Sequence, residues 1–159
     1  MVSKYILSSD FMNYSAEYGG RNYNTSIVRS YLVNTIYKAF SDDIKNILKD
    51  QTIYYTYNDE TYITDKIKCP SLHEVGLTYN YLEGDHGTIY PIFGDALIFE
   101  GPNKLSGRED GNTKGNTRYY WTRTSYSVSS NYVWVVRPDC TCTYNVVYAN
   151  SGVIAIIRF

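Results

Sequence analysis

The sequence lacks an excess of charge of either sign. Lys and Arg together number 15 and Asp and Glu number 16, which leaves a formal net charge of -1. A nucleic-acid-binding domain carries a basic patch or a basic tail, and neither is found here. We therefore expect no nucleic-acid partner.

Long hydrophobic runs are missing as well. No segment approaches the roughly eighteen consecutive apolar residues that span a bilayer. Met1–Ser9 also lacks the apolar centre and cleavage site of a signal peptide. These absences predict a soluble chain without membrane insertion.

Cysteine is scarce, with Cys69, Cys140 and Cys142 as the three thiols of the chain. They are too few and too unevenly spaced for a disulfide framework. Together with His73 and His86 they form a poor ligand set for zinc. We expect no metal site and no cofactor, and we interpret the thiols as structural or incidental.

Tyrosine, in contrast, is abundant. The chain of 159 residues holds 19 tyrosines, and aromatic residues make up 16% of it against 19% for charged residues. This composition is the reverse of that of a disordered protein. The length suits one domain with a hydrophobic core, and we expect residues 1–159 to form a single domain.

Helical periodicity is clearest between Ser26 and Phe40. Apolar residues recur there at steps of three and four, which predicts one buried stripe with Ser26 as the N-cap. A second short helix is predicted from Ser41, as its cap, to about Asp50. Its inward face is expected to hold three residues: Ile44, Ile47 and Leu48.

The middle of the chain changes to strand and loop patterns. Thr52–Tyr57 and Glu60–Thr64 predict a β-hairpin. Ser71 and Glu74 stand at capping-box spacing, which predicts a helix of one or two turns around His73. Gly84–Gly115 is irregular and is expected to be a long loop.

The last forty residues predict four strands that pair antiparallel. The strands are Tyr119–Thr124, Tyr132–Arg137, Thr143–Tyr148 and Val153–Arg158. The last of them shows no polar alternation, so we expect it at the centre of the sheet with both faces buried. Two early helices, a small late sheet and a long loop predict an α+β fold.

The strands and turns near the carboxyl end are rich in Tyr, Ser and Asn. Recognition loops use this mixture, because tyrosine offers a large contact area with few torsions and Ser and Asn offer adaptable hydrogen bonds. The same residues are also good strand and turn formers, and composition alone does not decide between the two interpretations. The candidate ligand-binding residues are Thr124, Tyr126, Ser127, Ser129, Asn131, Tyr132, Trp134, Arg137, Tyr144, Asn145, Tyr148 and Asn150.

The period of two also divides the strand that begins at Tyr132. Tyr132 and Trp134 fall on one face of that strand and Val133 and Val135 on the other, and either face could be the outer one. Trp121 is expected in the core. No catalytic residue is assigned, since the Asp85-His86 pair has no nucleophile at recognisable spacing.

Short motifs in a fixed order resemble a bacterial and phage domain of unknown function, DUF6273. That family shows S-x-I-R-x-W-L-N, F-Y-x-x-A-F-S, T-x-D-K with S-x-x-E-V, W-W-L-R-S, x-Y-V and G-V-R-P-A-L. The corresponding segments here are Asn24–Asn34, Lys38–Ser41, Thr64–Ile67 with Pro70–Val75, Tyr120–Thr124, Val133–Val136 and Gly152–Ile156. This chain has Tyr31 in place of the usual tryptophan, and Ile154 and Ala155 in place of Arg-Pro.

The resemblance implies a fold related to the C-type lectins, in which two helices flank a small twisted antiparallel sheet. Formylglycine-generating enzymes and the variable proteins of diversity-generating retroelements share that scaffold. The strands before the first helix are short for such a fold, which is consistent with a domain from the C-terminal part of a longer protein.

The resemblance also implies a function: non-catalytic recognition of a protein or glycan on a host or neighbouring cell surface. The carrier would be a phage tail or a bacterial surface protein, with a binding face that the retroelement could diversify. The alternatives are a structural domain of a tail or surface complex, with oligomer formation left open, and, more remotely, an oxidoreductase of the formylglycine-generating type.

Overall fold

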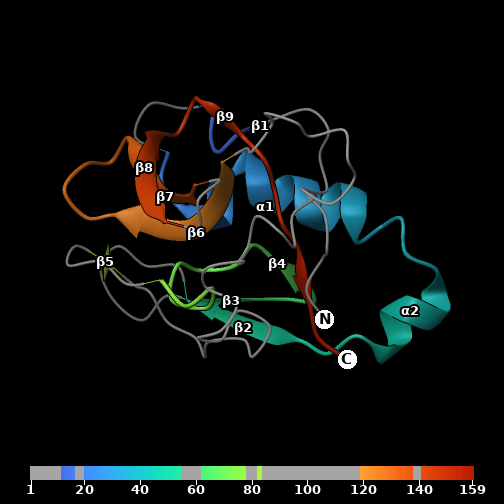
Figure 1. The fold of residues 1–159 in the computed structure, drawn as a ribbon. Helices are drawn as coiled ribbons and strands as arrows, with labels where there is room; N and C mark the ends of the chain where they lie inside the picture. The colour runs from blue at the N-terminus through green and yellow to red at the C-terminus, as the bar shows by residue number, and fades with distance from the viewer. Residues whose placement is uncertain (1–11, 17–19, 55–61, 78–81, 84–118, 138–140) are drawn as a thin grey trace, which may run out of the picture.

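The fold is taken from a computed structural model, which describes residues 12–16, 20–54, 62–77, 82–83, 119–137 and 141–159. Figure 1 shows the arrangement of the elements along the chain. The long loop predicted at Gly84–Gly115, the Asp85-His86 pair and Cys140 lie outside the described residues.

Helix α1 (Ile27–Tyr31) begins where the sequence predicts. Ser26 has an extended backbone, and its Oγ accepts a hydrogen bond from the N–H of Arg29 at 3.0 Å. The helix continues as a π-helical segment, η2 (Leu32–Ile36), which ends with a bond from the N–H of Tyr37 to the carbonyl of Leu32 at 2.8 Å. The predicted apolar stripe packs on the core, and a single 3-10 turn, η1 (Tyr23–Thr25), precedes it.

Helix α2 (Asp42–Ile47) is shorter than expected. Its last residue is followed directly by Leu48, which is extended and buried. The side chain of Ser41 makes no capping bond, so the predicted serine cap is wrong in its detail. Ile47 was expected to face inward, but it is 55% exposed, because the helix ends before a full apolar stripe can form.

The predicted hairpin is confirmed. Strands β2 (Gln51–Tyr54) and β3 (Tyr62–Asp65) pair antiparallel, with Ile53 opposite Ile63 and Tyr54 opposite Tyr62. Alternate residues of β2 are buried and exposed, as a strand with one face on the core requires. The turn that joins the two strands lies outside the described residues.

A four-stranded antiparallel sheet carries the C-terminal half. Its order is β5 (Leu82–Glu83), β6 (Tyr120–Tyr126), β7 (Tyr132–Val136) and β8 (Cys142–Val146). Strands β6, β7 and β8 are consecutive and antiparallel, which confirms three of the four predicted strands.

A register shift interrupts β6. Trp121 pairs with Val135 and Ser125 with Val133, so β6 advances four residues while β7 advances two. A bulge of this kind redirects side chains. Here it points Arg123 away from the ladder, toward the carbonyl of Cys69 and the carboxylate of Glu74.

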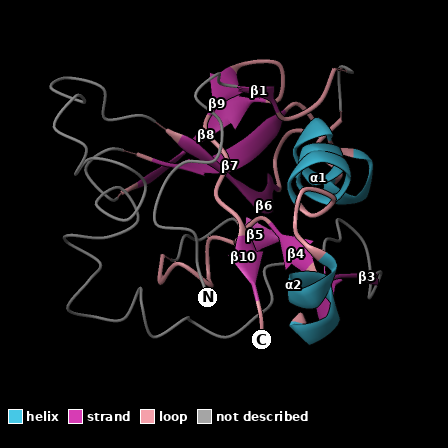
Figure 2. Cartoon of the chain, turned by 90° about the vertical axis from the view of Figure 1, so that its right-hand side faces the viewer, coloured by secondary structure: helices cyan, strands magenta, loops and turns pink. Residues whose placement is uncertain are grey.

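Both faces of this sheet are covered near its centre, and the residues divide between the two faces as the period of two predicts. One face holds Trp121, Val133 and Val135, which share a cluster with Val28 and Leu32 of the first helix. The opposite face packs against Leu72 and Val75 and carries three more buried residues of the sheet: Tyr120, Trp134 and Val136. Helix α1 therefore lies against one face of the sheet, as Figure 2 shows.

The predicted last strand is wrong in its pairing. Only β10 (Ile156–Ile157) forms a ladder, with β4 (Ile67–Lys68), and it lies outside the four-stranded sheet. Val153, Ile154 and Ala155 are buried, as expected, but have no ladder partners of their own. Before them, β9 (Asn150–Ser151) pairs with β1 (Met12–Asn13), and Figure 1 shows the chain running from β9 past β4 to the C-terminus. Val153 and Ala155 pack in one hydrophobic cluster and Ile154 in the other, so each residue of this run needs an apolar side chain.

Ion pairs, buried at Glu74 and partly buried at Asp65, connect the elements. The carboxylate of Glu74 accepts from Nζ of Lys68 at 2.6 Å and from Nη1 of Arg123, and all three residues are buried. Glu74 and Ser71 also form the predicted capping box, with two reciprocal bonds of 3.0 Å, although the segment forms a single turn and no longer helix. Asp65 of β3 accepts two bonds from the guanidinium of Arg29, at 2.8 and 3.1 Å.

The fold is thus a mixture of two short helices and small antiparallel sheets, consistent with the α+β class. Within the part of the chain that the structure describes, no helix has the length and apolar character needed to cross a membrane.

Candidate binding surface

Four aromatic rings meet at one end of the sheet, and we call them the aromatic cluster: Tyr126, Tyr132, Trp134 and Tyr144. The rings of Tyr126 and Tyr144 are stacked, with centroids 4.4 Å apart and an angle of 27° between their planes. Tyr132 meets Tyr144 edge-on at 5.2 Å. Rings at these distances and angles attract one another beyond the area they bury.

The strand register explains why these rings meet. Trp134 stands directly opposite Tyr144 on the neighbouring strand, and Tyr132 lies two residues along on the same face. The shift in β6 pairs Ser125 with Val133, which brings Tyr126 beside Tyr132, with ring centroids 6.1 Å apart. The cluster therefore combines side chains from β6, β7 and β8.

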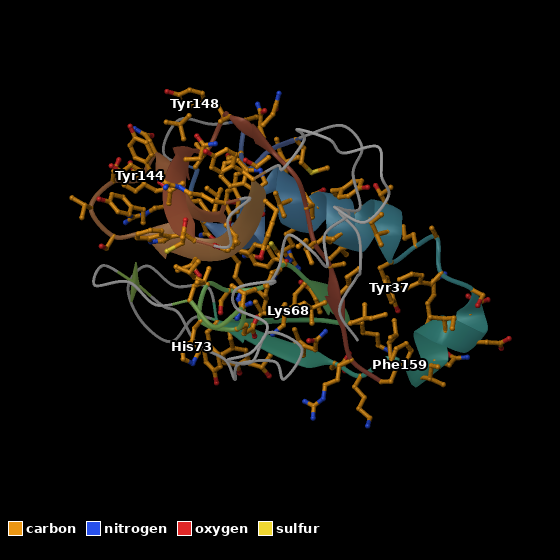
Figure 3. The ribbon with its side chains drawn as sticks, in the orientation of Figure 1. Tyr37, Lys68, His73, Tyr144, Tyr148 and Phe159 are labelled. Atoms are coloured by element: carbon orange, nitrogen blue, oxygen red, sulfur yellow. The ribbon has the colours of Figure 1, made fainter. Side chains whose placement is uncertain are left out.

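Exposure divides the cluster into a base and a rim. Trp134 is 1% exposed, with the ring of Tyr126 5.5 Å away and that of Tyr144 6.1 Å away. Tyr144 is 47% exposed, and Tyr126 and Tyr132 are half-buried. Figure 3 shows Tyr144 at the outer rim of the sheet. The tryptophan supports three phenol rings that reach solvent.

The turn between β6 and β7 lies next to these rings. Ser127, Ser129 and Asn131 are half-buried there, and Val128 is 67% exposed. We define the tyrosine face as Tyr126, Tyr132 and Tyr144 together with the turn Ser127–Asn131. This face brings together six of the twelve predicted site residues.

Two predicted site residues lie in the interior of the structure. Thr124 is 2% exposed, and its Oγ1 accepts a bond from the N–H of Leu72 at 2.8 Å. Trp134 is buried and cannot touch a ligand until the rings above it move. Both follow from alternation along strands that are covered on two faces.

The four remaining predicted residues lie away from the tyrosine face. Asn145 pairs with the buried Val133 on the opposite face, and its Oδ1 accepts from the N–H of Val146 at 3.0 Å. Arg137 follows the end of β7 farthest from Tyr132, and Asn150 belongs to β9. Tyr148, 54% exposed, follows β8 and reaches the outer surface in Figure 3.

The tyrosine face is nearly free of charge. Between Thr124 and Ile157 the sequence contains only Arg137 and Asp139 as charged residues. The face offers phenol and serine hydroxyls, one amide and aromatic carbon. It can therefore hydrogen-bond and stack, but it has no carboxylate or ammonium group of its own.

Nucleophiles and metal ligands do not gather at this face. Cys69 is buried, its thiol lies 3.0 Å from the carbonyl of Trp121, and burial raises its pKa well above the usual range. Burial also raises the pKa of Cys142. A thiol with a raised pKa is a poor nucleophile at neutral pH. Among the described residues no group of His, Cys, Asp and Glu is arranged to hold a metal ion.

The family model described as "Domain of unknown function (DUF6273)" matches residues 1–158. The chain belongs to the DUF6273 family. No curated protein and no solved structure matches it significantly.

The DUF6273 motif residues form the internal scaffold of the molecule. Ser26 of the first motif caps α1, and Arg29 of the same motif binds Asp65 of the third. Glu74 of the S-x-x-E-V segment binds Arg123 of the segment that corresponds to W-W-L-R-S. These bonds connect distant parts of the fold, whereas Tyr126, Tyr132 and Tyr144 stand outside the short motif segments, although the family model spans them too.

Sequence reasoning missed Arg21, which supports the tyrosine face from behind. It is 5% exposed, and its Nη1 donates to the carbonyl oxygens of Tyr126 and Ser127. No local pattern around Arg21 could indicate this contact, because its partners lie more than a hundred residues later in the chain.

Proposed function

We propose that this DUF6273 domain is a non-catalytic recognition module that binds its ligand through the tyrosine face. The observation that carries the proposal is the stacked pair of Tyr126 and Tyr144, half-buried and 47% exposed respectively, on a buried tryptophan. Aromatic rings held rigidly by neighbours lose little entropy on binding, and tyrosines of this kind are frequent anchors of interfaces.

The ligand that fits this face carries no negative charge. Bringing an anion against stacked rings would strip its water without supplying an opposite charge, because the faces of aromatic rings are negative. Neutral parts of a glycan or of a protein surface avoid that cost. The polar groups of Ser127, Ser129 and Asn131 can replace part of the water that such a ligand loses.

The family resemblance supports the finer parts of the proposal. A scaffold of the C-type lectin kind presents its variable surface on the C-terminal strands, where the tyrosine face lies in this chain. We therefore propose a lectin-like domain of bacterial or phage origin, carried by a phage tail or a cell-surface protein. Diversification by a retroelement would leave a near-repeat of codons 119–159 beside a reverse transcriptase gene, which sequencing of the surrounding DNA tests.

The test of recognition uses fluorescently labelled protein on a panel of fixed bacterial cells and on an array of neutral and acidic oligosaccharides. On any positive target, Tyr144→Ser should reduce binding at least tenfold, as expected for an interface anchor. Tyr62→Ser is the matched control, because Tyr62 is 60% exposed on β3, outside the face. Equal binding by the wild type and Tyr144→Ser would remove the proposal.

A structural role in a larger assembly is the second candidate. It is favoured by a separate exposed pair, Tyr54 and Tyr62, whose rings are 6.0 Å apart and which are 40% and 60% exposed. Exposed aromatic patches mark contact surfaces. Light scattering over a concentration series distinguishes this candidate: an oligomer that dissociates on Tyr62→Ser, with no loss of cell binding on Tyr144→Ser, favours it.

A formylglycine-generating activity is the remotest candidate. That chemistry needs reactive thiolates, and burial raises the pKa of both thiols in the described part of the chain, Cys69 and Cys142. Copper uptake that depends on Cys140 and Cys142 would revive it.

A further inference from the structure

Arg21 holds the turn at the edge of the tyrosine face from the interior. Its Nη1 donates to the carbonyl oxygen of Tyr126 and, at 3.3 Å, to that of Ser127. In return, the hydroxyl of Ser125 donates to the carbonyl oxygen of Arg21 at 3.1 Å. One buried residue thus binds three consecutive residues at the end of β6.

This contact lies where the ring of Tyr126, which meets the three other rings of the aromatic cluster, leaves the backbone. The ring of Tyr126 is within 6.1 Å of Tyr132, 5.5 Å of Trp134 and 4.4 Å of Tyr144, measured between centroids. A guanidinium donates along fixed directions in its plane, so it restricts the carbonyl groups that it binds. Fixing the backbone at Tyr126 fixes the direction in which its ring departs.

The two hydrogen bonds from Arg21 to the turn end on backbone oxygens. The turn has one side-chain bond, from the N–H of Asn131 to the Oγ of Ser129 at 3.3 Å. Other bonds that shape it are between backbone atoms. The N–H of Tyr132 donates to the carbonyl of Ser129 at 3.4 Å, and that of Val147 donates to the carbonyl of Asn131 at 2.8 Å. Such contacts do not depend on which side chains the turn carries.

We propose that Arg21 is a positioning residue for the tyrosine face: it sets the backbone of Tyr126 and Ser127 and leaves the exposed side chains of the turn free to change. Val128 and Ser130 are the exposed positions concerned. The inference rests on the proposed function only for the claim that the face meets a ligand. The support itself can be measured on the free protein.

The test is hydrogen exchange and NMR of the full chain, with Arg21→Lys against Arg29→Lys. Both changes remove a forked donor, but the guanidinium of Arg29 binds the carboxylate of Asp65 in β3. In Arg21→Lys, the amides of Ser129, Asn131 and Tyr132 should exchange about tenfold faster or more, since bonds from a charged donor are lost. The ring signals of Tyr126 and Tyr144 should shift as their stack loosens. Arg29→Lys should lower the melting temperature and leave these signals in place.

Three further variants make the test decisive. Ser125→Ala removes one bond to Arg21 and should produce smaller changes of the same kind, even if Arg21→Lys does not fold. Val128→Asn and Ser130→Tyr should leave the exchange of the three amides within about twofold of the wild type, because backbone bonds hold the turn.

The inference is overturned if Arg21→Lys leaves the amides and the ring signals unchanged, or if Arg29→Lys moves them equally. It is also overturned if Val128→Asn opens the turn as far as Arg21→Lys does. These outcomes are separate from those of the cell-binding test. If Tyr144→Ser binds cells as the wild type does while Arg21→Lys still loosens the turn, the proposed function fails and the positioning role stands.

Discussion

Two aromatic residues opposite one another in the sheet have different roles because of their exposure. Trp134 is 1% exposed and fills the space beneath the rings, whereas Tyr144 is 47% exposed on top of them. The sequence places both on alternate positions of strands, but it does not say which face is covered. The covering residues, such as Leu72 and Val75, come from a turn almost sixty positions earlier.

Substitution of the two residues should therefore affect different properties. Trp134→Ala should lower the free energy of unfolding by about 3–5 kcal/mol, as is usual for removing a buried aromatic side chain. Tyr144→Ala should lower it by less than about 1 kcal/mol, because only half of that ring is buried. Denaturant titration of both variants checks the difference, and equal losses would mean that Tyr144 belongs to the core.

Glu74 should make stability depend on pH. Burial on its own would raise the pKa of Glu74, but Arg123 and Lys68 outweigh it and hold that pKa below its usual value of 4.5. Because the pKa is lowered in the folded state, its contribution is complete above the unfolded pKa and is lost as pH falls through the folded one.

We predict that Glu74→Gln lowers the free energy of unfolding at pH 7 by about 3 kcal/mol, because two cations lose a buried partner. The difference from the wild type should stay constant down to about pH 5 and shrink below about pH 4.5. Unfolding in urea at a series of pH values measures it. A difference that does not change between pH 7 and pH 3 would contradict the assignment of the charge to Glu74.

At the scale of elements, the sequence correctly predicts those features that depend on contacts between residues close in the chain. Ser26 caps α1, Ser71 and Glu74 form the capping box, and the β2–β3 hairpin pairs as its alternation indicates. The same patterns give wrong predictions where an element pairs with residues distant in the sequence. The run Val153–Ile156 reads as a central strand because it is apolar throughout, yet it is buried between two clusters and pairs only at its end.

For the tyrosine face, too, the sequence predicts the contacts that follow from local alternation and misses those that depend on distant residues. Alternation brings Tyr132 and Tyr144 to one face once β7 and β8 pair. Tyr126 reaches them through the register shift in β6, within which Arg123 binds the distant Glu74, and no local pattern reveals that shift. Arg21 was missed for the same reason, because its partners Tyr126 and Ser127 are distant in the sequence.

The cap of α1 supplies a test at this scale. Ser26 is buried, accepts from Arg29 and donates to the carbonyl of Tyr23 at 2.8 Å. Ser26→Ala should cost about 1–2 kcal/mol of stability, at the upper end for an N-cap because the freed groups stay buried. Thr25→Ala, at an exposed neighbour, is the control and should cost less than about 0.5 kcal/mol. Thermal unfolding of both variants gives the comparison.

Across the molecule as a whole, the paired charged residues lie in other segments than the proposed binding surface. The charged motif residues Arg29, Asp65, Glu74 and Arg123 pair with one another inside the scaffold, whereas the segment from Thr124 to Ile157 holds only two charges.

The near absence of charge predicts binding that is insensitive to salt. Affinity for a positive cell or glycan target should change by less than about threefold between 50 and 500 mM NaCl, since screening acts on charge pairs that the face lacks. A fall of tenfold or more would show that charged groups outside the tyrosine face make the contact.

The most direct measurement of the central claim is footprinting of the bound protein. Hydroxyl radicals oxidise exposed tyrosine rings, and mass spectrometry reports the oxidation of Tyr144 and Tyr62 in the same sample, free and bound to a positive target. The account predicts that binding protects Tyr144 and leaves Tyr62 as reactive as in the free protein. Protection of Tyr62 with Tyr144 still reactive would contradict it.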